Sequence, residues 1–469
     1  MNAAGVIVEF NPLHNGHIEH LHQTKRLTHR DKIIAVMSGN FVQRGEPALC
    51  DKWRRTHMAL LAGVDIVIEL PVPYVVSGAD YFARGSVKLL GATGVVDRLC
   101  FGSEIGDIKL IKEAGRVLAF EPDEYKAALH DGLGRGFSFA AARGAALAEV
   151  LGVANTKRSS PQPGRETAKP GDGNGSIPDG LLTKPNNGLG MEYCKALWQM
   201  GWPMEVYTSY RGAGGASATA IRKAVWDGVA SVPSWLSCDP YASKSGNARN
   251  KTIIGEAAES MPQYVCDILI EAIEAGEIAR LDDYYEIFRY LLFTRDIVMG
   301  EGLENRFRHF AKQALYLATQ PLRFTKRPPS CAEPDINEKN TIESPDANRP
   351  LTALMDAVKT KRYTYTRLQR AVTGVVLGMQ PADLAAYENT GGPGYIRVLG
   401  FRRDAAGLLG EMTRRASLPV LTTGHAMDKL AGLNAKMLAK ELEVGDIYRM
   451  AFGGAAGYRH ERGVPLVVV

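Results

Sequence analysis

Over the first 120 residues, short apolar runs alternate with longer segments in which apolar residues recur at helical spacing. The apolar runs are rich in Val and Ile and have the length of strands: residues 5–9, 33–37, 65–70 and 95–101. The helical segments begin at residue 17 and then span residues 51–62, 79–90 and 107–118. This alternation is typical of βαβ units, so it predicts an α/β fold: a Rossmann-like parallel sheet with helices on both faces.

Beyond residue 120 the pattern is less regular. Two proline-rich segments hold few large apolar residues, so they do not repay the entropy cost of ordering and we expect flexible loops there. Helical periodicity returns between them, in residues 263–275 and 284–310. The expected division is an α/β domain at 1–223 with a flexible insertion at 159–180, a mostly α-helical domain at 224–327, a flexible linker at 328–350, and a basic region of mixed pattern at 351–469.

Composition favours a globular protein of a reducing compartment. Hydrophobic residues make up 45% of the 469 residues, charged residues make up 23%, and the net charge of +5 permits a nucleic-acid partner. The N-terminus does not resemble a signal peptide, and the most apolar window, residues 66–76, is too short to cross a bilayer. The six cysteines are far apart, which argues against a zinc site or disulfides. We therefore expect a cytoplasmic protein without a membrane contact.

The tetrapeptide His14-Asn-Gly-His17 lies between the first expected strand and the first expected helix. At such a turn Gly16 lets the backbone approach a phosphate, the first helical amides are donors, and the helix dipole favours negative charge. The imidazoles of His14 and His17 would add donors to the charge that builds on a phosphoryl group. The motif therefore predicts a nucleotide site in which both histidines are catalytic.

A glycine-rich stretch at residues 210–222 is a second candidate for phosphate binding. Ser217 and Thr219 could cap a helix that starts there, with Arg222 on its first turn. One interpretation is a simple cap with a solvated arginine. The other is a clamp on a leaving pyrophosphate, in which Arg211 and the catalytic Arg222 are bidentate donors. Two phosphate-type turns in one chain favour the clamp.

Two further segments have both a structural and a functional interpretation. Lys184-Pro-Asn-Asn187 precedes an expected helix, so we favour capping by asparagine over recognition of a nucleobase edge by its amide. Residues 359–370 are a solvated face or a site for unpaired RNA, since Tyr363 and Tyr365 are interleaved among cations. The cations that we expect to bind tRNA are Lys359, Lys361, Arg362, Arg367 and Arg370.

Together these motifs occur in the order found in one family. They lie at residues 5–17, 37–47, 67–71, 82–86, 101–104, 184–187, 217–222 and 359–370. On these residues the chain resembles the tRNA(Met) cytidine acetate ligases, which are H-x-G-H nucleotidyltransferases. The resemblance covers most of residues 1–120, then 181–223 and 351–403, and is weakest over the last 50 residues.

The resemblance implies that ATP, with Mg²⁺, activates acetate as acetyl-adenylate. The acetyl group then passes to N4 of the wobble cytidine of elongator tRNA(Met). No dedicated metal ligands and no protein partner are implied. The ATP-binding residues carried over by motif, together with the two hydroxyls of the second phosphate turn, are Ile7, Val8, Glu9, Phe10, Asn11, Pro12, Leu13, His14, Asn15, Gly16, His17, Ile18, Glu19, His20, Gly102, Asn186, Arg211, Ser217 and Thr219.

Two other functions stay open. One is adenylyl transfer of the pantothenate synthetase or nicotinamide mononucleotide adenylyltransferase type, although those enzymes are commonly shorter and lack a basic segment like residues 359–370. The other is a nucleotide-sensing RNA-binding protein without catalysis. Such a protein would not need intact His14, His17 and Arg222.

Overall fold

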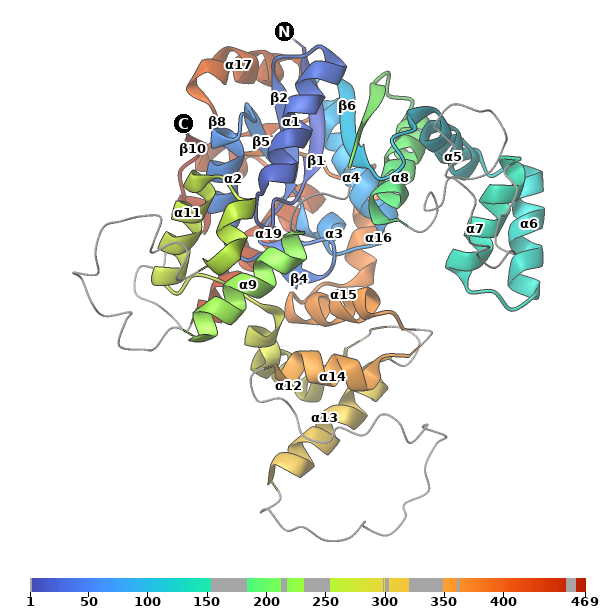
Figure 1. The fold of residues 1–469 in the computed structure, drawn as a ribbon. Coiled ribbons are helices and arrows are strands. Elements are labelled where there is room, and N and C mark those ends of the chain that lie inside the picture. The colour runs from blue at the N-terminus through green and yellow to red at the C-terminus, as the bar shows by residue number, and fades with distance from the viewer. Residues whose placement is uncertain are drawn as a thin grey trace, which may run out of the picture.

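An eight-stranded, mostly parallel sheet forms the centre of the molecule in a computed structural model (Figure 1). The structure describes residues 2–152, 184–211, 217–231, 254–297, 299, 303–319, 349–360, 363–452 and 461–469. The expected insertion at 159–180 lies outside these residues, as does the expected linker at 328–350 apart from Arg349 and Pro350. No helix within the described ranges is long and apolar enough to cross a membrane.

The N-terminal part has the predicted alternation of strands and helices. Strands β1 (Ala3–Val8), β2 (Ile33–Ser38), β5 (Ile66–Leu70), β6 (Val96–Ser103) and β7 (Glu205–Tyr210) are parallel and run in the order β5-β2-β1-β6-β7. The helices are α1 (Asn15–Thr28), α2 (Lys52–Leu61), α3 (Val72–Val75), α4 (Ala79–Ala92), α5 (Ile108–Phe120) and α8 (Pro185–Met200). Strands β2 and β5 are buried along their whole length, as expected for a sheet covered on both faces. The Rossmann-like fold predicted from periodicity is thus confirmed.

The C-terminal part contributes three more strands to the same sheet. Strand β8 (Ile396–Phe401) pairs antiparallel with β5, and β9 (Val420–Leu421) and β10 (Val467–Val468) both pair with β8. Helix α18 (Gly424–Asp428) packs against β9, and α16 (Pro381–Asn389) and α19 (Gly432–Arg449) pack against α3. Helix α17 (Ala406–Arg415) follows β8 along the chain. The division expected at residue 351 did not include a sheet shared by the N-terminal and C-terminal parts. The domain boundaries stay a prediction.

The remaining helices form three smaller groups (Figure 1). Helices α6 (Asp123–Gly134) and α7 (Phe139–Val150) project beside α5. Helices α12 (Tyr285–Thr294), α13 (Leu303–Thr319), α14 (Pro350–Val358) and α15 (Tyr365–Val376) lie below the sheet in this view, while α9 (Ala218–Ser231) and α11 (Gln263–Glu274) lie near α2. The helical segment expected at 284–310 is therefore two helices rather than one.

Four buried charges hold the C-terminal strands against the N-terminal sheet. Glu69 of β5 and Arg397 of β8 are cross-strand neighbours, with Arg397 Nη1 2.8 Å from Glu69 Oε2. Lys52 Nζ lies 2.5 Å from Glu69 Oε1 and 2.5 Å from Glu461 Oε1, and Arg397 Nη2 lies 3.3 Å from the same Glu461 oxygen. All four side chains are about 1% exposed. Two cations thus balance two carboxylates, as burial requires.

Glu441 of α19 is a fifth buried group beside these charges. Burial raises its pKa well above the ordinary value of 4.5, and the nearby Glu69 carboxylate raises it further. When protonated, Glu441 donates to Glu69, and its other oxygen accepts the Val72 amide at 2.7 Å. Both carboxyl groups approach Gly39, where a Cβ would lie 2.7 Å from Glu69 Oε1. Glu441 is therefore a neutral hydrogen-bonding member of this buried charge cluster.

We expect Glu441→Gln and Glu69→Gln to have opposite consequences for stability. The glutamine at 441 keeps a donor to Glu69. In wild type, folding above pH 4.5 requires Glu441 to take up a proton that the unfolded chain has released, and glutamine avoids this cost. Its apparent melting temperature should equal or exceed that of wild type at pH 7, and this advantage should vanish below about pH 4.5. Glu69→Gln leaves Lys52 and Arg397 facing one carboxylate, at a cost of about 3–5 kcal/mol.

Thermal unfolding followed by circular dichroism at pH 4 and pH 7 measures both effects. A Glu441→Gln protein that melts below Glu69→Gln at pH 7 would contradict the assignment of a neutral Glu441.

Candidate functional site

A cavity of about 1010 Å³ opens at the carboxyl ends of β1, β6 and β7. This is the edge at which parallel α/β sheets bind ligands. Its lining includes Ile7, Val8, Glu9, Phe10, Asn11, His14, Gly16, His17, Glu19, His20, Gly102, Asn186, Arg211, Ser217, Thr219 and Arg222. The structure therefore brings the H-x-G-H turn and the second phosphate-type turn together around one cavity.

The turn after β1 places His14 at the start of α1. Phe10 has a φ of 46°, in the left-handed region, and the Asn11–Pro12 peptide bond is cis. The Asn11 side chain accepts the Leu49 amide at 2.8 Å, which fixes the turn against the next βα unit. His14 is the N-cap of α1, so the helix begins at Asn15, two residues before the position expected from sequence.

The hydrogen bonds of His14 and His17 define which ring nitrogen carries the hydrogen. His14 Nδ1 accepts the Gly16 amide at 3.1 Å, and His17 Nδ1 accepts the His14 amide at 3.2 Å. A neutral ring that accepts at Nδ1 carries its hydrogen on Nε2. The two rings stack with their centroids 3.8 Å apart. The turn thus presents a pair of Nε2–H donors, and one amide expected to be free, that of Gly16, is capped by His14.

All three histidines of this site favour the neutral form. Burial, with a smaller contribution from the Arg211 charge, lowers the pKa of His14 to about 4 and that of His20 to about 4. Burial lowers the pKa of His17 well below its ordinary value, and His14 and Arg211 lower it further. His20 Nδ1 also lies 2.7 Å from Ser209 Oγ of β7. At pH 7 these rings therefore act as neutral donors rather than as cations.

Glu104, from the Phe101-Gly-Ser-Glu104 motif, organises the opposite wall. Its carboxylate accepts the Asn186 side chain at 2.7 Å and the Asn187 amide at 3.0 Å, so Glu104 satisfies the first turn of α8. Asn187 in return accepts the Glu104 amide at 2.9 Å. Lys184, not an asparagine, is the N-cap of α8, so the capping role that we favoured for Asn186 and Asn187 is wrong. The two asparagines instead join α8 to the loop after β6.

Arg211 is, with Arg44, one of two exposed arginines that line the cavity. Its Nη1 donates to Asn186 Oδ1 at 3.1 Å, and no carboxylate within the described ranges pairs with it. Its side chain lies over Gly102, where a Cβ would come within 2.7 Å of Arg211 Cδ. A glycine at 102 is therefore needed for Arg211 to reach across β6 toward the histidines.

Arg222 is buried and occupied rather than solvated. It is 6% exposed, donates from Nη1 to the Asn11 carbonyl at 2.9 Å, and pairs through Nη2 with Glu46 Oε1 at 2.8 Å. Ser217 caps α9 by accepting the Ala220 amide at 3.2 Å, and Thr219 Oγ1 lies 3.4 Å from Arg222 Nη2. The solvated-arginine interpretation is thus wrong. Arg222 joins α9 to the H-x-G-H turn and to the loop that carries Glu46.

Four residues of the expected ATP segment do not line the cavity: Pro12, Leu13, Asn15 and Ile18. Leu13 is fully buried, and Ile18 packs against the hydrophobic core on the other side of α1. The Asn15 side chain donates to the Glu259 carbonyl at 3.2 Å. These residues shape the turn without facing the cavity.

Several residues that line the cavity are not among those expected from the sequence. Strands β3 (Phe41–Val42) and β4 (Glu46–Pro47) form a hairpin that contributes Val42, Gln43, Arg44 and Glu46. The sequence signal was present, because these residues belong to the 37–47 motif. Glu9 links this hairpin to β1, since its Oε1 accepts the Gln43 amide at 2.6 Å and Ser38 Oγ at 3.2 Å. Burial raises the Glu9 pKa above its ordinary value.

None of the described residues of the basic segment at 359–370 lines this cavity, although Gln369 donates to Glu46 Oε2 at 3.5 Å. Tyr363 is 6% exposed and packs under Arg367, 5.3 Å from its ring centroid, so it is not available to stack on a base. Lys359 is exposed beside Tyr365, and Arg370 lines a second cavity. Lys361 and Arg362 lie outside the described residues.

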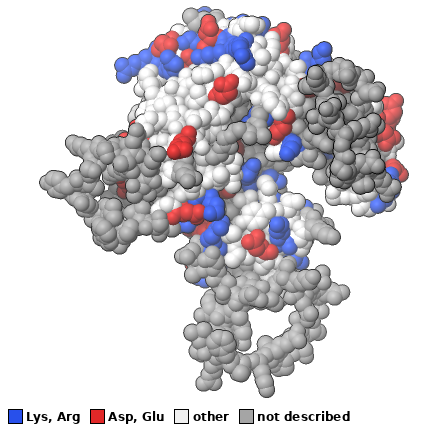
Figure 2. Space-filling model, viewed as in Figure 1, with Lys and Arg blue, Asp and Glu red and all other residues white. Residues whose placement is uncertain are grey.

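Three of the arginines near α17 pair with two carboxylates. Lys and Arg side chains gather along the edge of the molecule near this helix, with acidic side chains among them (Figure 2). Arg414 and Arg415 both pair with Glu411, and Arg402 pairs with Asp404. This edge is therefore a weaker candidate for RNA binding than the number of its arginines alone suggests.

Comparisons with known proteins agree with this geometry. The sequence model of the HIGH Nucleotidyl Transferase family matches residues 1–324 and 335–462. The tRNA(Met) cytidine acetate ligase of Caldanaerobacter subterraneus subsp. tengcongensis is 34% identical over 464 residues, covering 96% of each chain. The enzyme of the same name from Acetivibrio thermocellus is 32% identical, covering 97% of this chain and 96% of its own.

A solved structure is similar over the whole chain. The crystal structure of Thermotoga maritima TmcAL bound with alpha-thio ATP has a TM-score of 0.77 at 29% identity and covers 100% of both chains. An apo form of the same protein has a TM-score of 0.76. The chain therefore belongs to the tRNA(Met) cytidine acetate ligase family of the HIGH nucleotidyl transferases.

Proposed function

We propose that this protein uses ATP to activate acetate as acetyl-adenylate and transfers the acetyl group to N4 of the wobble cytidine of elongator tRNA(Met). The observation that carries the proposal is the pair of neutral histidines at the start of α1. Their Nε2 atoms form no hydrogen bond within the described residues and are left for a ligand in the cavity. The relatives' names and the nucleotide analogue in the related crystal structure support it.

Adenylation requires positioning and charge stabilisation, not a protein nucleophile. The acetate oxygen attacks the α-phosphorus of ATP, the bond to the bridging oxygen breaks, and pyrophosphate leaves with that electron pair. His14 and His17 would donate to the phosphoryl oxygens from Nε2, since donors aimed at developing charge lower the barrier most in a site that excludes water. Neutral imidazole rings suit this role, because each can donate a hydrogen bond from Nε2 to a phosphoryl oxygen and keep its proton.

Arg211 would supply the positive charge beside the polyphosphate, since it is exposed on the cavity and lacks a carboxylate partner within the described ranges. Arg222, already paired with Glu46, would act on catalysis by holding the H-x-G-H turn against α9. No group of three potential metal ligands occurs in the part of the chain that the structure describes. Phosphate oxygens would therefore supply most of the coordination of a Mg²⁺ ion that accompanies ATP.

In the second half-reaction the cytidine N4 attacks the acetyl carbonyl, the bond to the phosphate oxygen breaks, and AMP leaves while N4 loses one proton. An anticodon-loop base is unpaired, so presenting it costs little stacking energy. Recognition of elongator tRNA(Met) would fall to cations such as Lys359 and Arg367, together with Lys361 and Arg362. Adenylyl transfer to pantoate or to nicotinamide mononucleotide is disfavoured by the family to which the chain belongs.

Two substitutions at His17 separate its two nitrogens. An asparagine places an acceptor where Nδ1 lies, and a glutamine places a donor where Nε2 lies. His17→Asn should keep the hydrogen bond from the His14 amide and the stability of α1, but reduce acetate-dependent ATP–pyrophosphate exchange by about 10²-fold or more. His17→Gln should retain more exchange activity while losing some thermal stability.

The matched control is His22→Ala, an exposed position on the same helix that does not line the cavity. It should leave exchange unchanged. Equal exchange by wild type and His17→Asn would refute the role assigned to Nε2.

The acceptor is tested by reaction with labelled acetate, ATP and tRNA(Met), followed by nuclease digestion and mass analysis. One acetyl group should appear on the wobble cytidine. Replacing that cytidine with uridine should abolish labelling, because uridine has a carbonyl in place of the amine. Label on the terminal adenosine would instead indicate an aminoacylation-like transfer and overturn the proposed acceptor.

A further inference from the structure

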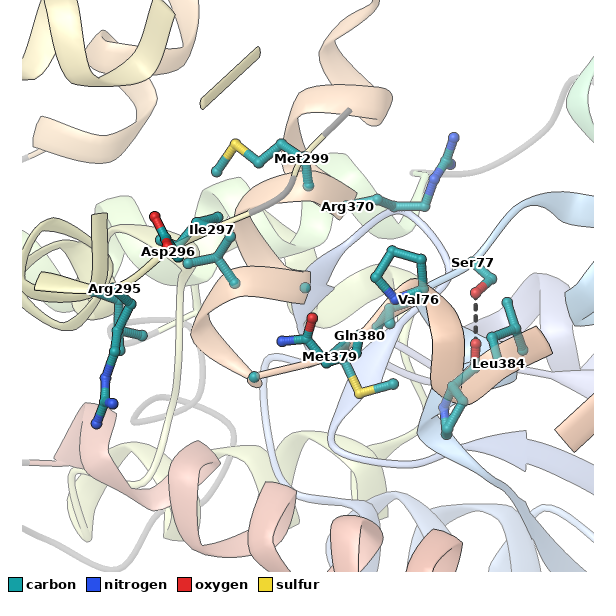
Figure 3. Close-up of a pocket in the computed structure, with 17 residues that line it drawn as sticks. Val76, Ser77, Arg295, Asp296, Ile297, Met299, Arg370, Met379, Gln380 and Leu384 are labelled. Carbon is teal, nitrogen blue, oxygen red and sulfur yellow. Dashed lines mark hydrogen bonds between the residues drawn. The ribbon is translucent and has the colours of Figure 1, made fainter. Parts of the chain in front are cut away.

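A second cavity of about 670 Å³ lies between α3, the end of α12, α15 and the start of α16. Its centre is apolar, with Val76, Met299 and Met379 around it (Figure 3). The volume falls within the usual range for small ligands, roughly 300–1,000 Å³. Gly374 of α15 leaves its floor open, since a Cβ at this position would meet no atom within 4 Å.

Two cations lie at opposite margins of this cavity in Figure 3, Arg295 and Arg370. Neither guanidinium has a hydrogen bond or ion pair to a side chain in the part of the chain that the structure describes. Burial lowers the Arg370 pKa, Arg367 nearby lowers it further, and the Asp80 carboxylate raises it. An anion at this margin would add to the effect of Asp80, because it would offset the desolvated charge of Arg370.

The second cavity is a neighbour of the larger cavity at the carboxyl ends of β1, β6 and β7, which is called the ATP cavity because the proposed function places ATP there. The hairpin of β3 and β4 separates them: Glu46 lines the ATP cavity, while the Gly45 carbonyl accepts Thr373 Oγ1 of α15 at 2.7 Å. Gly45 has a φ of +79°, and a Cβ there would lie 2.4 Å from the Arg370 amide. A chain that follows the surface over this hairpin could therefore reach both cavities.

We propose that this second cavity binds one unpaired nucleotide of the tRNA substrate, other than the cytidine that is acetylated. The base would enter between the apolar side chains, and Arg295 and Arg370 would contact the flanking phosphates. Proteins hold unpaired RNA by stacking bases on aromatic rings or guanidinium planes and by neutralising phosphates. This cavity offers guanidinium groups and aliphatic side chains for these two roles. The Gln380 amide at the margin offers a donor and an acceptor to the base edge. The inference rests on the proposed function for its ligand.

The test fills the cavity through Gly374→Leu. The substitution meets open space, and leucine favours a helix more than glycine does, so folding should be retained. Gly410→Leu, in α17 and also with no atom within 4 Å of a Cβ, is the matched control outside the cavity. In equilibrium binding without ATP, Gly374→Leu should weaken binding of tRNA(Met) by on the order of 10-fold or more. Gly410→Leu should bind like wild type.

The charge is tested by Arg370→Gln. Loss of one phosphate contact should reduce the slope of log affinity against log salt by about 0.7. Acetate-dependent ATP–pyrophosphate exchange should be unchanged in both cavity variants, since the adenylation site is separate. If wild type itself shows no acetate-dependent exchange, the proposed function is wrong. The binding measurements test the second cavity separately, because tRNA binding does not require adenylation.

The occupant is identified with tRNAs that each lack one anticodon-loop base. Wild type should lose affinity when one particular base other than the wobble cytidine is removed, and Gly374→Leu should lose nothing further for the same tRNA. Additive losses at every position, or wild-type affinity in Gly374→Leu, would overturn the inference. Sensitivity to removal of the wobble base alone would mean that the cavity holds the acetylated nucleotide, which also contradicts it.

Discussion

The antiparallel contact between β5 and β8 depends on charge balance in a place without water. Glu69 and Arg397 face each other across the two strands, and Lys52 and Glu461 complete the balance from α2 and the C-terminal end. Removing any one of these groups would leave a buried charge unpaired, which costs more than the pair itself contributes. The cluster thus specifies where the C-terminal strands sit. It also fixes the start of α2 and, through Gly39, the loop that leads to the β3–β4 hairpin of the ATP cavity.

Two of the helix starts at the cavity beyond β1, β6 and β7 are used differently. At α1 the histidines cap the turn with Nδ1, so their Nε2–H groups remain for a ligand. At α8 the amides are already taken by Glu104, which leaves Arg211 as the positive group on that side. In the proposed function, neutral donors on one wall and a cation on the other would stabilise phosphate charge without burying an unpaired cation when no nucleotide is bound.

Periodicity predicted the N-terminal strands and helices to within a few residues, because each has a local apolar pattern. The H-x-G-H turn and the 210–222 stretch were also recognisable, since each is contiguous. The partners of Asn187 and Arg222 were not predictable, because Glu104 and Glu46 lie far from them in the sequence. The same reason hid the joining of β8 to β5. The burial of Tyr363 was not predictable either, although its ring partner Arg367 is only four residues away. The interpretation of Tyr363 as a stacking residue failed because burial of a ring cannot be read from its charged neighbours.

The place of β8 has a consequence for synthesis of the protein on the ribosome. Strand β5 ends at Leu70, whereas the strand that covers its free edge begins at Ile396. At ~5–20 residues per second, this interval lasts on the order of 20–60 s. During it, a mostly apolar edge with unpaired amides and carbonyls is open to pairing with other nascent chains. Glu69 is the one charged residue on that edge, so the carboxylate that later completes the buried cluster also opposes aggregation before Arg397 has been made.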